Sequence, residues 1–182
     1  MAKVCTNEKT ASRQRWIENG LLELMQKCRF EDITVTDLCQ HLELSRRSFY
    51  RYFRDLEDVL DTLMDHTFQD VAISEASLTI QDLEEHYRFW FRQKPLLSAL
   101  AHSEMYGKLT EYALKYAGEE SIKAYLSQKD LEMKLSREIC LFVISGSVSL
   151  VISWYADGFR KTPEQMAEIA YRMLYEPLLK KK

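Results

Sequence analysis

Three arginines, Arg46, Arg47 and Arg51, fall within six residues, and no acidic residue lies among them. An arginine side chain can donate two hydrogen bonds to the O6 and N7 atoms of guanine, and each good pair discriminates against the wrong base by about 1–3 kcal/mol. The alternative is a row of solvated surface charges. A cluster of this kind without acidic partners favours contact with nucleic acid.

The segment Thr34–Phe53 contains the elements that would hold these side chains. Thr34 and Asp37 have the spacing of a capping box, so a short helix is expected to begin after Thr34. Ser45 is a candidate N-cap for a second, basic helix after a short turn, and we expect this helix to include Arg51 and Tyr52. Two short helices joined by a turn are typical of a helix-turn-helix, although an αα-hairpin with a charged outer face has the same outline. The first turns of a recognition helix face the major groove, and this predicts three base contacts: Arg46, Arg47 and Ser48.

Composition limits the fold class. The chain has 182 residues, with only five glycines and three prolines, and this disfavours a turn-rich all-β fold. The net charge of −3 gives no overall sign of nucleic-acid binding, but a local basic patch matters more than the sum. The first ten residues lack the apolar core of a signal peptide, so a cytoplasmic location is expected.

The cysteines do not form a recognisable site. Cys5 lies near the start of the chain, whereas Cys28, Cys39 and Cys140 fall among apolar residues and are expected to be buried free thiols. A redox or metal sensor is the alternative. Because no C-x-x-C pair or histidine at ligand spacing occurs, we predict no metal and no cofactor.

The uncharged stretch from Ile139 to Ala156 is nearly long enough to cross a bilayer. Several serines dilute its hydrophobicity, however, and a helix that is apolar on nearly all sides can also be buried in a protein core. We therefore predict no membrane contact. Small residues lie along one side of this helix at Ser145, Gly146, Ser149 and Ser153, and they indicate close packing, either at a dimer interface or against the last helix.

Helical patterns cover the rest of the chain. Helix one is expected from about Thr10 to Lys27, and helix four from an N-cap at Asp55. A long penultimate helix is expected from about Leu131 to Tyr155, ended by Gly158, and Thr162 has the spacing of a further capping box with Gln165. The expected fold is all-α, with a DNA-binding domain at residues 1–66 joined by helix four to a helical domain at residues 67–182.

The order and spacing of nine residues resemble the tetracycline-repressor (TetR/AcrR) family of transcriptional regulators. These residues are Thr34, Val35, Asp37, Leu38, Ser45, Phe49, Tyr50, Tyr52 and Phe53. The segment from Trp154 to Met166 resembles a C-terminal domain found in part of the same family. The resemblance implies a homodimer that binds palindromic double-stranded DNA and, typically, a repressor released when a small-molecule effector binds the C-terminal domain.

The resemblance also implies roles for individual residues. Candidate phosphate contacts are Thr34, Thr36, Ser45, Tyr50, Tyr52 and Arg54. Candidate residues of an effector pocket, which could equally be core residues, are His86, Phe89, Trp90, Met105, Tyr106 and Tyr112. Candidate residues of a dimer interface on the last two helices are Ser145, Gly146, Ser149, Ile152, Ser153, Met166, Ala170 and Met173.

Three positions depart from the family pattern. Glu43 replaces the usual glycine of the turn, which predicts an altered or strained turn. Arg47 replaces a usual small residue, and Leu56 replaces a usual lysine that contacts phosphate. These departures keep an alternative open, in which a TetR-like adaptor or coactivator acts through protein contacts. No glycine-rich phosphate loop, nucleophile elbow or metal-binding spacing occurs, so we do not expect an enzyme.

Overall fold

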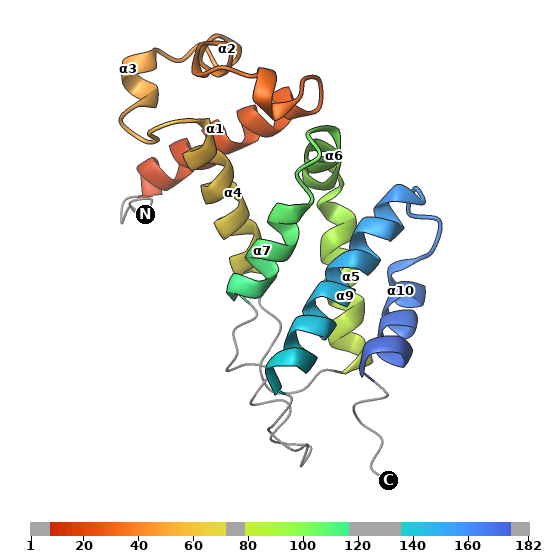
Figure 1. Ribbon diagram of the computed structural model, residues 1–182. Helices are drawn as coiled ribbons and strands as arrows, with labels where there is room; N and C mark the ends of the chain where they lie inside the picture. The colour runs from red at the N-terminus through yellow and green to blue at the C-terminus, as the bar shows by residue number, and fades with distance from the viewer. Residues whose placement is uncertain (1–7, 72–78, 117–135, 176–182) are drawn as a thin grey trace. The chain divides into compact units, whose positions relative to one another are not determined.

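The computed structural model describes residues 8–71, 79–116 and 136–175, which form helices and, in these ranges, no strand (Figure 1). The expected all-α fold is confirmed. The chain divides into two compact units. Among the described residues, the first unit contains residues 8–67 and 98–105, and the second contains the remainder. No pattern in the sequence indicates that residues 98–105 belong to the first unit.

The first unit is built around the helix-turn-helix. Its elements are α1 (Glu8–Met25), the 3-10 turn η1 (Phe30–Asp32), α2 (Val35–His41), α3 (Arg46–Phe49) and most of α4 (Leu56–Asp70). Apolar side chains at helical spacing on these elements form its core. The fully buried members include Ile17, Leu21, Met25, Leu38, Phe49, Leu60 and Met64.

Local capping determines where α2, α3 and α4 begin. The Thr34 amide donates to Asp37 Oδ2 at 2.8 Å, and the Asp37 amide donates to Thr34 Oγ1 at 3.2 Å. The hydrogen bond from the Thr34 hydroxyl also lowers the pKa of Asp37. Ser45 Oγ accepts from the Ser48 amide at 3.1 Å, and Asp55 Oδ1 accepts from the Asp58 amide at 2.8 Å. The three predicted N-caps are thus confirmed.

The turn between α2 and α3 contains the strained residue that the sequence predicts. Glu43 has a φ of 48°, in the left-handed region that favours glycine. The Glu43 amide donates to the Gln40 carbonyl at 3.2 Å, and the Leu44 amide donates to the Cys39 carbonyl at 2.8 Å. This pair of bonds is a Schellman motif. It satisfies two carbonyls at the end of α2 and places a glutamate where a glycine is usual.

The recognition helix is shorter than expected. We predicted that Arg51 and Tyr52 would lie on it, but α3 ends at Phe49. The Arg51 amide donates to Ser48 and the Tyr52 amide to Phe49, at 3.3 and 2.9 Å. Hydrogen bonds that reach back only three residues tighten the chain into a turn. The Arg51 and Tyr52 side chains therefore lie after the helix and not on one of its faces.

Residues 98–105 join the first unit through the end of α6 (Lys94–His102). Ala99 and Leu100 are completely buried. The Phe30 amide donates to Ser103 Oγ at 3.0 Å, and Arg29 pairs with Glu104 at 3.1 Å. The α6 end is therefore held to the η1 segment by packing and by polar contacts.

The second unit contains α5 (Ile80–Arg92), α7 (Gly107–Tyr116), α9 (Ser136–Ala156), α10 (Pro163–Ala170) and the π-helical turn η3 (Tyr171–Tyr175). Helix α10 packs along α5, and α7 packs against α9 (Figure 1). Capping boxes at Thr79 and Thr162 begin α5 and α10, and the second of these was predicted. Gly158 takes the left-handed conformation after α9, with a φ of 70°, as expected.

An aromatic cluster holds the connection between α9 and α10. Trp154 packs against Tyr87, Phe91 and Phe159, with ring centroids 5.6, 5.9 and 4.6 Å away. The Trp154 indole N–H donates to the Lys161 carbonyl at 2.9 Å. This side chain thus supplies both apolar contact and a hydrogen bond to the loop.

The structure corrects one prediction about the cysteines and leaves others open. Cys39 is buried, and burial raises the pKa of its thiol, but Cys28 is exposed in the turn after α1. Cys5 and the side chain of Cys140 lie outside the part of the chain that the structure describes. In the described ranges, no group of three His, Cys, Asp or Glu side chains is placed to hold a metal ion. None of the helices described there is long and apolar enough to span a bilayer.

Candidate nucleic-acid interface

Arg46, Arg47 and Arg51 are exposed, and none of them forms an ion pair with another described residue. Arg54 differs, because its guanidinium pairs with Asp58 Oδ1 at 3.1 Å and its amide donates to Asp58 Oδ2 at 3.0 Å. Burial opposes ionisation of Asp58, but the hydrogen bonds from Arg54 outweigh it, so the pKa of Asp58 lies below its usual value. The first three arginines therefore carry the uncompensated positive charge of this surface.

Arg46 connects the two helices of the motif. Its Nη1 atom donates to Thr36 Oγ1 of α2 at 3.2 Å, and its Nη2 atom donates to the Tyr50 hydroxyl at 3.4 Å. The guanidinium carbon also lies 6.0 Å from the centre of the Tyr50 ring, within reach of a cation–π interaction. Three predicted DNA contacts are thus brought together around one side chain.

The hydroxyl groups of the predicted phosphate contacts fall into two sets. Phosphate oxygens only accept hydrogen bonds at neutral pH, so a hydroxyl that contacts phosphate must have its proton available. The Thr34 hydroxyl donates to the Asp37 carboxylate, and the Ser45 hydroxyl donates to Ser48 Oγ. Both protons are already used in hydrogen bonds within the motif.

The second set keeps its protons. Thr36 and Tyr50 accept hydrogen bonds from Arg46, so each can donate its own proton outward. Tyr50 is 50% exposed, and Tyr52 retains part of its surface. The Ser48 hydroxyl accepts from Ser45 and can also donate. These are the side chains that can donate to a backbone phosphate without disturbing a cap.

Leu56 occupies the first position of α4 and is only 8% exposed. Its side chain belongs to the core of the first unit, because Val59 and Leu60 continue the same buried surface. The departure at this position therefore replaces a charge with apolar packing. Arg54 is the nearby cation, but Asp58 holds it.

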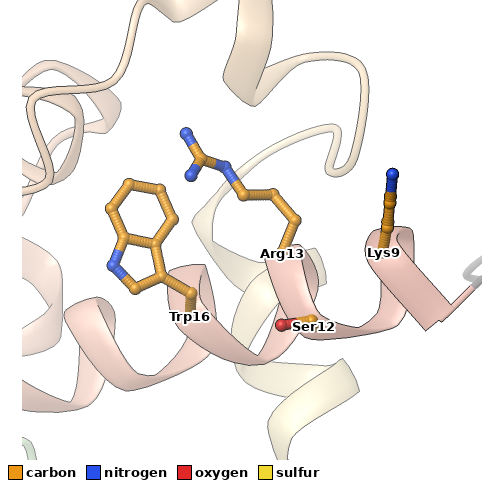
Figure 2. A pocket seen from close by; sticks show the side chains of 4 residues that line it. All are labelled: Lys9, Ser12, Arg13 and Trp16. Atoms are coloured by element: carbon orange, nitrogen blue, oxygen red, sulfur yellow. The ribbon is translucent and has the colours of Figure 1, made fainter.

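A second basic feature lies on α1. Lys9, Ser12, Arg13 and Trp16 line a shallow hollow of about 530 Å³ along one helix face (Figure 2). The Arg13 guanidinium lies 3.9 Å from the centre of the Trp16 ring, so the two side chains form a cation–π pair. This face therefore carries two cationic side chains, Lys9 and Arg13, near the start of α1.

The predicted effector-pocket residues differ in burial and in the unit to which they belong. Trp90 and Tyr112 are buried, and both contact Phe68, with ring centroids 5.5 and 6.1 Å apart. Phe89 and Tyr106 keep part of their surface, and Met105 belongs to the first unit. The aromatic members of the set thus include core residues, and their role in binding an effector stays a prediction.

His86 is the polar exception in this region. The residue keeps some accessible surface, yet its Nδ1 atom is buried and has no hydrogen-bond partner among the described residues. The Tyr87 and Trp90 rings lie edge-on to the imidazole, at 5.5 and 6.3 Å. Burial lowers the pKa of His86 to about 4, so the imidazole is neutral at physiological pH.

The predicted dimer-interface residues also divide by exposure. Ser149, Ser153 and Met173 are exposed, and Ser145, Gly146 and Ile152 are partly so, whereas Met166 and Ala170 are buried within the protomer. The two buried residues have almost no surface left to offer a partner. Sequence reasoning missed Phe142, which is 68% exposed on α9. Its neighbours are apolar in both directions, so no periodicity could show which side of the helix faces outward.

Comparison with known proteins identifies the class. Residues 81–176, more than half of the chain, match the TetR model described as a transcriptional regulator C-terminal region. The chain therefore belongs to the TetR family of transcriptional regulators, which are not enzymes. A 64-residue stretch is 28% identical to the HTH-type dhaKLM operon transcriptional activator DhaS of Lactococcus lactis. That stretch covers 35% of this chain and only about a third, 34%, of the relative.

Solved structures show the same fold. The dihydroxyacetone kinase operon activator DhaS superimposes with a TM-score of 0.65 at 16% identity, covering 91% of this chain and 95% of that one. A TetR regulator from Streptococcus agalactiae gives 0.66 at 16% identity, with the same coverage. The fatty acid degradation regulator FadR from Bacillus halodurans gives 0.67 at 14% identity, covering 92% and 97%. At these identities the likeness concerns the fold alone.

Proposed function

We propose that this protein regulates transcription by binding a palindromic DNA operator as a homodimer. The observation that carries the proposal is the exposed, acid-free arginine cluster on and directly after the second helix of a helix-turn-helix, in a chain of the TetR family. Arg46, Arg47 and Ser48 lie in the first turn of α3, where a recognition helix presents donors to the major groove. The donors in Thr36, Tyr50 and Tyr52 supply phosphate contacts that position the helix without reading the sequence.

The proposed homodimer fits the geometry of DNA. Two recognition helices must enter successive major grooves about 34–36 Å apart, and a two-fold dimer matches a palindrome. On α9, Phe142 exposes a large apolar side chain, and the small residues Ser145 and Ser149 allow a second helix to approach closely. We assign this face, together with Met173, to the interface between protomers.

The sign of regulation is a further part of the proposal. We propose a repressor released by a small molecule that binds the second unit, as the family resemblance implies. Activation is the second candidate, and the observation that favours it is the similarity to DhaS, an operon activator. Transcription in vitro from a template that carries the selected operator distinguishes the two, because added protein lowers the transcript level in one case and raises it in the other.

Selection from a random duplex pool at low salt tests DNA binding. We expect enrichment of a palindrome with half-sites about one helical turn apart, and affinity that falls as salt rises. Enrichment of no palindrome at low salt would contradict operator binding and favour the adaptor or coactivator.

Light scattering tests the dimer at micromolar concentration. We expect a dimer for the wild type and a monomer for Phe142→Glu, because the variant places a charge in an apolar interface. Leu114→Glu is the matched control, since Leu114 is an exposed leucine on α7, outside the proposed interface. A monomeric wild-type protein would contradict the proposed assembly.

A further inference from the structure

Arg46 and Arg47 are neighbours in the first turn of α3 and are both exposed, but their surroundings differ. Arg46 donates from both terminal nitrogens to hydroxyl groups of its own unit. Arg47 forms no hydrogen bond or ion pair with any other residue that the structure describes. Of these two adjacent arginines, one is therefore hydrogen-bonded within its own unit in the DNA-free protein, and the other is not.

We propose that Arg47 is the residue that determines sequence specificity, whereas Arg46 is a positioning residue that prepares Thr36 and Tyr50 to bind phosphate. This inference rests on the proposed function, since it assigns different tasks to two residues of the same interface. It also revises the expectation that both arginines read bases.

The hydrogen bonds of Arg46 explain the positioning role. A guanidinium group has donors only, so the Thr36 and Tyr50 oxygens must accept from it. Each hydroxyl then directs its proton away from Arg46. A phosphate oxygen is a pure acceptor, and it requires donors in that orientation. One side chain therefore orders two phosphate contacts, one from α2 and one from the turn after α3.

The same bonds make Arg46 a poor reader of bases. A bidentate contact with guanine needs two parallel N–H groups that are aimed at O6 and N7. Arg46 would have to leave or share its contacts with Thr36 and Tyr50 to turn its terminal nitrogens toward a base edge. All the N–H groups of the Arg47 guanidinium are available, and Arg47 loses no internal hydrogen bond when it contacts a base. The base that it recognises by this chemistry is guanine.

A comparison of two neutral, similarly long substitutions tests the division of labour. Arg46→Met and Arg47→Met each remove one charge, and Arg160→Met removes an exposed charge in the second unit as a control. Binding of each variant is measured on the palindrome enriched by the wild type and on a scrambled duplex of equal length. The guanines of each half-site are also replaced one at a time.

We expect Arg47→Met to reduce the ratio of palindrome to scrambled affinity by roughly 5–150-fold for each half-site, because each protomer of the dimer loses one base contact. Replacement of the recognised guanine should have no further effect in this variant. Arg46→Met should weaken binding to both duplexes by a similar factor and leave the ratio unchanged. Arg160→Met should bind as the wild type does.

Hydroxyl deletions complete the test. Thr36→Val and Tyr50→Phe should each weaken both duplexes, and neither should weaken binding further when Arg46 is already methionine, because interacting residues are not additive. The assignment would be overturned if Arg46→Met lowered the ratio of palindrome to scrambled affinity and Arg47→Met left it unchanged. It would also be overturned if the effects of Arg46→Met and Thr36→Val on binding were additive. A wild-type protein that enriches no palindrome would instead overturn the proposed function, and the inference with it.

Discussion

The two units of this protein differ in how their candidate functional residues relate to solvent. In the first unit, Arg46, Arg47 and Tyr50 are exposed, and their hydrogen bonds leave donors free for a ligand outside the unit. In the second unit, Trp90 and Tyr112 are buried among other aromatic rings. Substitutions in the first unit should therefore change binding with little loss of stability, and those in the second should change stability first.

Each unit also has a buried side-chain atom without a hydrogen-bond partner among the described residues. In the first unit one such atom is Glu18 Oε1, although the other carboxylate oxygen of Glu18 lies 3.0 Å from His66 Nδ1. In the second unit it is His86 Nδ1. A buried unsatisfied nitrogen costs about 1–3 kcal/mol, so His86 lowers the stability of the second unit by an amount of this order.

The largest stability effect is expected from Trp154→Ala. This change removes a buried aromatic side chain that contacts three other rings and donates to the Lys161 carbonyl. Large-to-small changes of this kind cost about 3–5 kcal/mol. The measurement is the free energy of unfolding from urea denaturation at one fixed protein concentration, because the stability of a dimer depends on concentration.

Phe142→Ala is the matched control for this substitution, because Phe142 is an aromatic residue of the same helix but is 68% exposed. At a protein concentration low enough for the wild type to be monomeric, we expect its effect on the free energy of unfolding to be within about 0.5 kcal/mol, because the interface then contributes nothing. Equal losses for the two variants would show that exposure in the protomer does not separate structural from interfacial positions on α9.

A smaller effect is expected from acidification, and it should depend on His86. The folded pKa of His86 is about 4, whereas the unfolded chain has the ordinary value near 6.5. Below pH 6.5 the unfolded chain takes up a proton that the folded protein does not, so stability falls as the pH falls from about 6.5 to 4. The loss is at most about 3–4 kcal/mol, at about 1.4 kcal/mol for each pKa unit.

His86→Phe tests this expectation, because it removes the titrating group and keeps an aromatic ring of similar shape. Urea denaturation between pH 7.5 and 5 should show a smaller loss of stability for the variant than for the wild type. Above pH 7 the stabilities of the two proteins should depend on pH in the same way, because His86 is then largely neutral in both the folded and the unfolded wild type. Parallel curves down to pH 5 would show that the imidazole is solvated in the folded protein.

Some of this structure follows from short stretches of sequence. The caps at Thr34, Ser45 and Thr162 involve residues three positions apart, so the sequence alone predicts them correctly. The left-handed residues Glu43 and Gly158 are equally local, because a helix end determines their backbone conformation. These features explain why the all-α fold and the helix-turn-helix outline could be predicted.

Contacts between distant residues could not be predicted in this way. The bond from Arg46 to Thr36 joins positions ten apart, and it depends on the angle between two helices. The return of residues 98–105 to the first unit depends on contacts with residues more than seventy positions earlier. Phe142 was missed for another reason: α9 is apolar on all sides, so its pattern does not distinguish an outer face from an inner one.

The smallest expected effect compares two helix ends that share one geometry. After α2 the left-handed position is Glu43, and after α9 it is Gly158, with φ values of 48° and 70°. A side chain other than that of glycine costs about 1–2 kcal/mol in this region. Glycine avoids this cost, but its extra freedom in the unfolded chain lowers stability by about 0.5–1 kcal/mol. Glu43→Gly should therefore stabilise the protein by about 0.5–1 kcal/mol, and Gly158→Ala should destabilise it by a similar amount.

Thermal unfolding of three variants measures this pair of effects. Glu43→Ala is the control for the lost carboxylate, because it keeps the Cβ atom and should gain nothing from relief of strain. If Glu43→Gly is no more stable than Glu43→Ala, the turn between α2 and α3 is not strained by its glutamate. In that case the departure at position 43 has no cost for folding, and its significance is limited to the charge that it places between the two helices of the motif.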